Sequence, residues 1–237
     1  LMKLQLEEMS GQYHISILGG QRQRYEYFGY TSGGVQYRYH INISNIRHAL
    51  KDTDSNEILF SPFFEIAGWE KLLPRIFTSR EVYVERNPDT LQSLFTSYHQ
   101  HPWGIQKNGT LIGYLISSED HSTVSELALL SPQDTKKVIK AYFHQFHLKS
   151  SSFLFPEYEV AICKEFSDFA EYYQIQPSNM YNIFDFAAVL DMFLTVKSCT
   201  CGLSDGIFSA VMDHQPITIT VCQNHVRVES HAAKDAV

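Results

Sequence analysis

The clearest pattern along the chain is a strict alternation of apolar and polar residues over positions 35–44. Apolar or aromatic side chains occupy every second position, and polar side chains lie between them, which predicts a half-buried strand. The apolar positions are Val35, Tyr37, Tyr39, Ile41 and Ile43. We expect this strand to complete the first of three units.

Two shorter patterns precede this strand. Residues 2–9 carry Met2, Leu6 and Met9 at helical spacing, which predicts an amphipathic helix. Residues 15–18 alternate as a short strand that ends at two glycines, because glycine reaches backbone conformations that other residues reach only at a cost. The residues that follow contain neither Pro nor Gly until Gly29, so we expect one or two helical turns there.

A second unit is predicted over residues 58–176, where helical and strand patterns alternate in the manner of an α/β domain. The expected elements are a buried helix over 59–77 that stops near Pro74, a helix at 89–98, strands at 103–105 and 111–116 joined by a hairpin at 107–109, a strand at 123–130, a helix at 132–147, a strand at 158–163 and a helix at 166–173. The polar stretch 45–57 reads as a linker with a short helix.

The last unit is expected to begin near Met180. Apolar residues between 184 and 194 predict an amphipathic helix, and a turn follows at 203–206. Three antiparallel strands are then expected at 207–212, 217–222 and 226–229. This unit is therefore a helix followed by a meander.

Composition narrows the class of protein. The 237 residues are 44% hydrophobic, enough for one large or several small cores, so disorder is not expected. The formal charge of −7 argues against a nucleic-acid partner, whose phosphates require clustered Lys and Arg. The four cysteines read as reduced thiols, since Cys199-Thr-Cys201 has too short a spacing for a zinc knuckle. With no signal peptide and no apolar run of about 20 residues, we expect a cytoplasmic protein without a membrane span.

One stretch indicates chemistry. Residues 18–30 read LGGQRQRYEYFGY, in which Tyr25-Glu26-x-x-Gly29-Tyr30 is entered from one predicted strand and followed by another. This arrangement resembles the last third of the Gcn5-related N-acetyltransferase (GNAT) fold. The extended run resembles the enhanced-intracellular-survival type of GNAT, which has two GNAT-like domains and a sterol-carrier-protein-like C-terminal domain.

The resemblance implies a fold class and a division of the chain. The expected class is α/β (α+β), with GNAT-like mixed sheets flanked by helices and a small sterol-carrier-like α+β domain. Residues 1–44 would be the C-terminal part of a catalytic GNAT domain, 45–57 a linker, 58–176 a second GNAT-like domain and 177–237 the sterol-carrier-like domain. The chain would then be a fragment, because the loop that holds the CoA pyrophosphate before the first helix is not in it. The family also commonly forms homo-oligomers.

The second unit is expected not to hold CoA. The resemblance places its pyrophosphate loop between Leu130 and Thr135, where the chain has Ser131-Pro132-Gln133-Asp134 in place of a glycine-rich sequence. A carboxylate at this position would repel a pyrophosphate.

The resemblance also implies site residues. Acetyl transfer to an amine requires an acid for the departing thiolate, and Tyr25 matches the position of the family's acid. Backbone amides near Leu18, Gly19 and Gly20 would help to bind acetyl-CoA. Arg22 and Arg24 are candidates for CoA contacts or for solvated surface roles, and Tyr25 itself could instead be a packing residue.

The pairs His99/His101 and His144/His147 lack a third ligand at sensible spacing, so no metal is expected.

Two alternatives for the function remain open. The main reading is an acetyl-CoA-dependent N-acetyltransferase acting on a primary amine of a small molecule, an aminoglycoside-like compound or a lysine side chain. The alternative is a non-catalytic module that binds a ligand or partner through a sterol-carrier-like apolar pocket.

Overall fold

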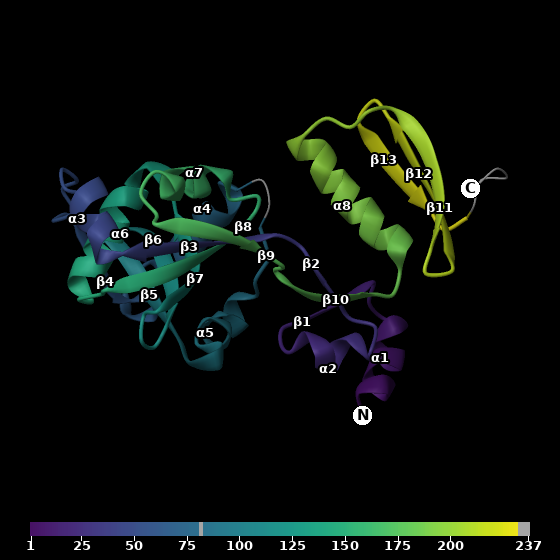
Figure 1. The fold of residues 1–237 in the computed structure, drawn as a ribbon, viewed down its shortest axis with the longest axis horizontal. Coiled ribbons are helices and arrows are strands. Elements are labelled where there is room, and N and C mark those ends of the chain that lie inside the picture. Colours follow the sequence, from purple (N-terminus) through teal and green to yellow (C-terminus); the bar gives the residue numbers. More distant parts are fainter. Residues whose placement is uncertain (81–82, 232–237) are drawn as a thin grey trace. The chain divides into compact units, whose positions relative to one another are not determined.

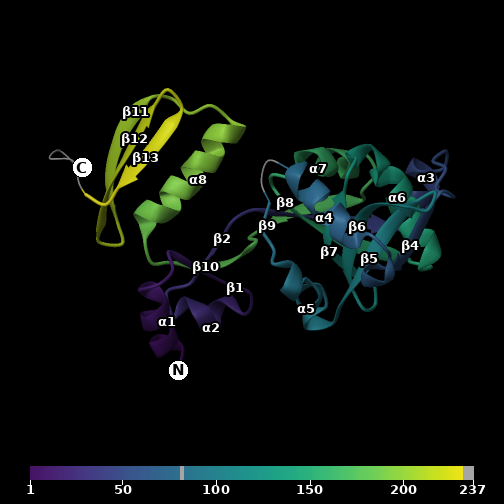
Figure 2. The same ribbon diagram turned by 180° about the vertical axis from the view of Figure 1, so that it is seen from behind.

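The computed structural model describes residues 1–80 and 83–231, which form two compact units. A continuous unit runs from Val35 to Gln176. A split unit combines Leu1–Gly34 with Pro177–Val237. Figures 1 and 2 label the helices and strands of both units from opposite sides.

A seven-stranded mixed sheet forms the centre of the continuous unit (Figure 1). Its strands, in spatial order, are β4 (Ile58–Pro62), β5 (Gln100–Lys107), β6 (Thr110–Ser118), β7 (Thr123–Leu129), β8 (Ser150–Pro156), β3 (Gln36–Asn42) and β9 (Tyr172–Gln176). Neighbouring strands are antiparallel except β7 and β8, which are parallel. The β5–β6 hairpin turns at Asn108 and Gly109, both with positive φ, as its sequence predicts.

Helices cover both faces of this sheet. The α-helices are α3 (Ile43–Ala49), α4 (Trp69–Thr78), α5 (Leu91–Phe95), α6 (Thr135–Gln145) and α7 (Val160–Ser167); short 3₁₀ helices lie at Phe63–Glu65, Pro88–Thr90, Ser97–His99 and Pro132–Asp134. Alternation along β6 separates two cores, because Leu115 belongs to the core that includes α6 and α7, whereas Tyr114 and Ile116 belong to the core that includes α4 and α5.

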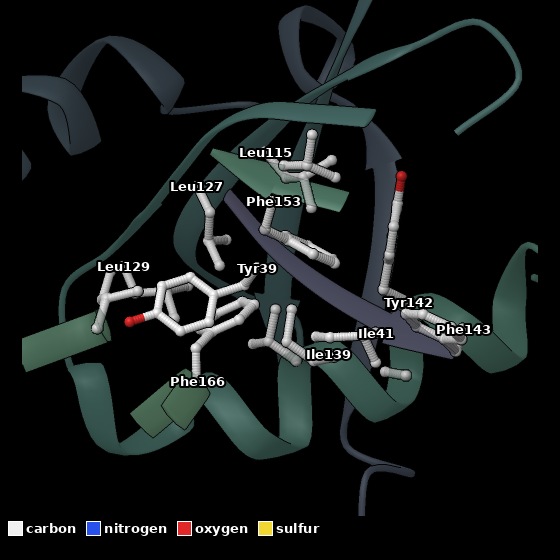
Figure 3. Close-up of a cluster of buried hydrophobic side chains, with 14 of the residues drawn as sticks. Tyr39, Ile41, Leu115, Leu127, Leu129, Ile139, Tyr142, Phe143, Phe153 and Phe166 are labelled. Carbon is white, nitrogen blue, oxygen red and sulfur yellow. The ribbon is translucent and has the colours of Figure 1, made fainter. Parts of the chain in front are cut away.

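Aromatic side chains fill the larger core (Figure 3). Phe166 of α7 has its ring centroid 5.5 Å from that of Tyr39 and 5.0 Å from that of Phe153. Both Phe153 and Phe166 are fully buried. Burial of such rings is the largest apolar contribution that single residues make to a core.

The two parallel strands of the sheet separate along their length. β7 and β8 pair at Thr123 with Ser152 and at Val124 with Phe153, and they pair no further. Beyond these residues the strands diverge, which opens the sheet between their C-terminal ends.

The split unit contains a small sheet built from distant parts of the chain. Its strands are β1 (Ile15–Leu18), β10 (Asn179–Ile183) and β2 (Thr31–Gly33), in that order, with both pairs antiparallel. Helix α1 (Met2–Ser10) precedes β1, and helix α2 (Arg22–Glu26) lies between β1 and β2.

A helix and a meander complete the split unit, as the sequence predicts. They are α8 (Phe186–Thr200), β11 (Gly206–Met212), β12 (Gln215–Cys222) and β13 (His225–Glu229). Helix α8 lies against the sheet (Figures 1 and 2), and the Val228 N–H donates to Asp191 Oδ1 at 3.2 Å. Within residues 1–80 and 83–231, no helix combines the length and the apolar character that crossing a bilayer requires.

The strand predicted at 35–44, which spans Gln36–Asn42 in the structure, lies in a different unit from the one expected. As β3 it pairs with β8 through seven residue pairs, from Gln36 to Asn42, and with β9 on its other side. The alternation predicted a strand correctly, but it carries no information about the strand's partners. The chain is thus grouped as 1–34 with 177–237 and 35–176, whereas we expected boundaries at 44, 57 and 176.

The expected linker at 45–57 is also packed in part. The Asn42 side chain accepts from the Asn45 N–H, and the Asn45 side chain accepts from the Asn42 N–H, so this pair begins α3. Ile46 and Leu50 are then 1% exposed in the core.

Three predicted elements have another form in the structure. The stretch 59–77 contains a strand and then a helix, and α4 continues through Pro74 in its interior, where the proline ring removes one i→i−4 backbone hydrogen bond. Residues 160–167 form a helix in place of a strand, and 172–176 form a strand in place of a helix. The strand that precedes α7 is β8, whose three serines obscured it in the sequence.

Candidate functional site

The candidate site begins where β1 ends. Gly20 has a φ of 137°, a conformation that favours glycine. A Cβ atom at this position would lie 2.9 Å from Cε2 of Tyr25. Glycine is therefore required here twice, by the backbone and by the tyrosine ring that lies against it.

Tyr25 lies on α2 and is half-buried. Its ring makes an edge contact with Tyr30, with centroids 6.3 Å apart, and the Arg24 guanidinium lies 5.6 Å from its centroid. Among the described residues, no group forms a hydrogen bond with the Tyr25 hydroxyl. The ring is thus held in place while the hydroxyl is left available.

The two arginines differ in their contacts. Arg22 Nε lies 3.5 Å from Glu26 Oε1 in an exposed ion pair, and the two residues are one helical turn apart. Such surface pairs add little to stability, so Arg22 could exchange this partner for a phosphate at low cost. Arg24 is exposed above the ring of Tyr25. The structure brings Gly20, Arg24 and Tyr25 together.

A buried hydrogen bond fixes the strand beneath the tyrosine. Ser16 Oγ and the Tyr30 hydroxyl lie 2.7 Å apart, and these residues are 6% and 3% exposed. The Tyr30 N–H also donates to the Tyr25 carbonyl at 3.3 Å. Ser16 was not predicted to be buried or to belong to the site, because the alternation of β1 suggested that its isoleucines would be the buried residues. Instead Ile17 is 59% exposed.

An open pocket of about 480 Å³ lies between α1 and β1. It is lined mostly by apolar side chains, among them Met2, Leu6, Met9, Ile17 and Leu18. β1 pairs with β10 along one edge only. The apolar face predicted for residues 2–9 therefore exists, but it borders a pocket.

Replacing Gly20 with alanine should displace the Tyr25 ring and destabilise the split unit by about 1–3 kcal/mol, the usual cost of a strained backbone conformation. Calorimetric unfolding of both variants measures this loss. Gly19→Ala is the matched control, because nothing lies within 4 Å of its Cβ position. Equal stabilities for the two variants would contradict the contact.

The loop expected to exclude CoA in the second unit has a clear role in the continuous unit. Residues Pro132–Asp134 form a 3₁₀ helix before α6. Asp134 Oδ1 accepts from Lys107 Nζ at 2.7 Å, and this contact raises the pKa of Lys107. A carboxylate therefore lies at the position where the resemblance places a pyrophosphate loop, and the exclusion of CoA stays a prediction.

The described residues contain no group of three or more His, Cys, Asp or Glu side chains suited to a metal ion. His144 and His147 are exposed, as are Cys199, Cys201 and Cys222. Cys163 is buried, and burial raises the pKa of its thiol to about 11.

Comparisons with known proteins identify the fold. No protein-family model matches the chain, and no curated protein matches it by sequence. Among solved structures, a GCN5-related N-acetyltransferase from Anabaena variabilis superposes with a TM-score of 0.61 at 15% identity, over 98% of this chain and 63% of that one. A probable N-acyltransferase of unknown function from Enterococcus faecalis gives 0.63 at 16% identity, over 99% and 62%. Eis1 from Mycobacterium abscessus gives 0.52 at 18% identity, over 98% and 63%.

These likenesses confirm the predicted fold class, an α/β fold with mixed sheets flanked by helices, and show that the fold is that of the GCN5-related N-acetyltransferases. At such low identity they show the fold alone. The chain spans less than two thirds of the length of each of these structures. The sterol-carrier-like domain remains a prediction.

Proposed function

We propose that this chain is part of an acetyl-CoA-dependent N-acetyltransferase that transfers an acetyl group to a primary amine. The observation that carries the proposal is Tyr25, whose ring lies against Gly20 at the end of a strand while its hydroxyl makes no hydrogen bond with the described residues. The fold shared with GCN5-related N-acetyltransferases supports it.

The chemistry requires a proton donor. A neutral amine attacks the thioester carbonyl, the carbon–sulfur bond breaks, and the CoA thiolate leaves. The nitrogen loses its surplus proton to solvent, and the proton donor is reprotonated from solvent. A tyrosine is protonated at neutral pH, and its usual pKa of about 10 lies only one to two units above that of a thiol. Tyr25 therefore protonates the departing thiolate.

Other residues in this stretch would hold the co-substrate. In this proposal the N–H groups of Leu18, Gly19 and Gly20 donate to carbonyl or phosphate oxygens of acetyl-CoA. Gly19 and Gly20 are exposed, and Leu18 is the last residue of β1. Arg22 and Arg24 would approach the phosphates, since both guanidinium groups are exposed beside the tyrosine. Acetyl-CoA enters as a substrate, and no metal takes part in this proposal.

A titration tests the proposal most directly. The intact protein that carries this chain should bind acetyl-CoA in a calorimeter, and it should release free thiol when polyamines, aminoglycosides or lysine peptides are added. Absence of both acetyl-CoA binding and thiol release would refute the proposal. The amine that supports thiol release identifies the acceptor, and gel filtration of the same sample tests the proposed homo-oligomer.

The second candidate is a non-catalytic module that binds an apolar ligand through the last unit. Exposed apolar side chains favour it: Phe193 of α8 is 62% exposed, and Ile207 and Phe208 of β11 are 74% and 58% exposed. This candidate predicts binding of a fluorescent fatty acid together with no binding of acetyl-CoA. Binding of acetyl-CoA in the titration would therefore support the acetyltransferase, and its absence together with fatty-acid binding would support the non-catalytic module.

A further inference from the structure

A second pocket lies in the continuous unit, between the strands that diverge. It has a volume of about 140 Å³ and is bordered by Ser125 and Leu127 of β7 and by Leu154 and Pro156 of β8. One buried water requires roughly 10–15 Å³ by this measure, so the pocket has room for a small organic molecule. It is smaller than the pockets of about 300–1,000 Å³ that hold drug-sized ligands, so it would not enclose a whole CoA molecule.

Two largely buried ion pairs contribute to the lining of this pocket. The Arg86 guanidinium donates to both carboxylate oxygens of Glu126, at 3.1 and 2.8 Å. Arg80 lies 3.2 Å from Glu159, and none of these four side chains is more than 23% exposed. The Glu126 carboxylate also accepts from the Tyr114 hydroxyl. These charges balance, and Glu126 has no need of a further donor.

Two donors in the lining of the pocket have no acceptor among the described residues. The Nε–H of Arg86 is buried. The Tyr158 side chain is 45% exposed, so water can reach its hydroxyl, and partial burial raises the pKa of that hydroxyl. Buried polar groups in proteins are nearly always paired, so the Arg86 Nε–H is the donor that most needs an acceptor.

The rest of the lining is mainly apolar and aromatic. The rings of Phe77 and Tyr83 stack with centroids 5.8 Å apart and planes 5° from parallel. Phe155 and Leu127 also line the pocket. A ligand that suits this lining needs acceptor oxygens together with a flat or compact apolar body.

We propose that the continuous unit binds a small carboxylate with an apolar body, such as an aryl carboxylate, between the diverging ends of β7 and β8. The carboxylate accepts from Arg86 Nε and from the Tyr158 hydroxyl. The apolar body packs against Phe77 and Tyr83. Because this pocket is in the continuous unit and does not involve Tyr25, the proposal is independent of acetyl transfer.

Fluorine NMR with 4-fluorobenzoate as the probe tests the site in the intact protein. We expect a dissociation constant of about 1 mM or below, and binding at least tenfold weaker for the neutral analogue 4-fluorobenzamide. Excess acetyl-CoA should leave the binding of 4-fluorobenzoate unchanged. Equal binding of the two probes, or no binding of either, would overturn the proposal.

Two variants locate the site without removing an ion pair. Tyr158→Phe removes one proposed donor from a side chain that is 45% exposed, and it should weaken 4-fluorobenzoate binding about fivefold or more. Leu154→Phe fills the pocket and should abolish binding. Arg75→Gln removes an exposed arginine on α4 and serves as the control. Binding that survives both Tyr158→Phe and Leu154→Phe would place the ligand elsewhere and refute the site.

Discussion

Tyr25→Phe should lower the turnover of acetyl transfer about 100-fold or more, the usual scale for loss of a general acid. The substitution removes one oxygen and retains the ring that packs against Gly20 and Tyr30. Affinity for acetyl-CoA should therefore change little, so the loss should fall on kcat and leave KM nearly constant. Thiol release by the intact protein under saturating amine measures both parameters.

The neighbouring Tyr27 provides a matched control. It is 74% exposed and lies at the C-terminal end of the same short helix, so Tyr27→Phe removes an equivalent hydroxyl outside the site. We expect its turnover to match that of the unaltered protein. An unchanged rate in Tyr25→Phe would remove Tyr25 from the mechanism, even if acetyl-CoA still bound.

The sequence predicted the local geometry of this site better than its surroundings. Two glycines after an alternating strand indicated that the chain turns sharply where the strand ends. The structure explains why position 20 is a glycine through its φ and through the contact that a Cβ atom would make with Tyr25. The Ser16–Tyr30 hydrogen bond was not predictable, because a serine between two isoleucines normally indicates the exposed side of a strand. Its burial depends on a partner 14 residues away.

Strand pairing was the main feature that the sequence could not supply. β10 lies between β1 and β2 although more than 140 residues separate it from either, and no local pattern encodes such a pairing. β8 was missed for a related reason. Ser151 and Ser152 are buried with their hydroxyls paired, because Ser151 Oγ donates to the His121 carbonyl and Ser152 Oγ lies 3.4 Å from His40 Nδ1. Tertiary hydrogen bonds thus allow polar residues to occupy a central strand.

Helix α7 shows how a short apolar pattern can be misread. Residues 158–163 read as a strand from composition alone, yet Ile162, Cys163 and Phe166 are the buried side chains of a helix. Spacings of three and four residues in this set fit a helical face, but a short apolar run does not distinguish the two forms. Packing against β3 and β8 decides the outcome, since Phe166 contacts rings from both strands.

Phe166→Ala should reduce the free energy of unfolding of the continuous unit by about 3–5 kcal/mol, the range for removing a buried phenylalanine. The side chain is fully buried, and its ring lies 4.8 Å from that of Phe155 and 5.2 Å from that of Phe169, in addition to its contacts with Tyr39 and Phe153 (Figure 3). Four neighbouring rings therefore lose packing at once, and the surrounding helices and strands limit how far the cavity can collapse.

Tryptophan fluorescence reports this unit alone, because both tryptophans of the chain, Trp69 and Trp103, lie within it. Urea unfolding followed at this emission should show a lower midpoint for Phe166→Ala with an unchanged slope. Val160→Ala on the same helix is the control, since Val160 is 68% exposed and its truncation should change stability by no more than about 0.5 kcal/mol. A loss below about 1 kcal/mol for Phe166→Ala would show that α7 does not hold the aromatic core together.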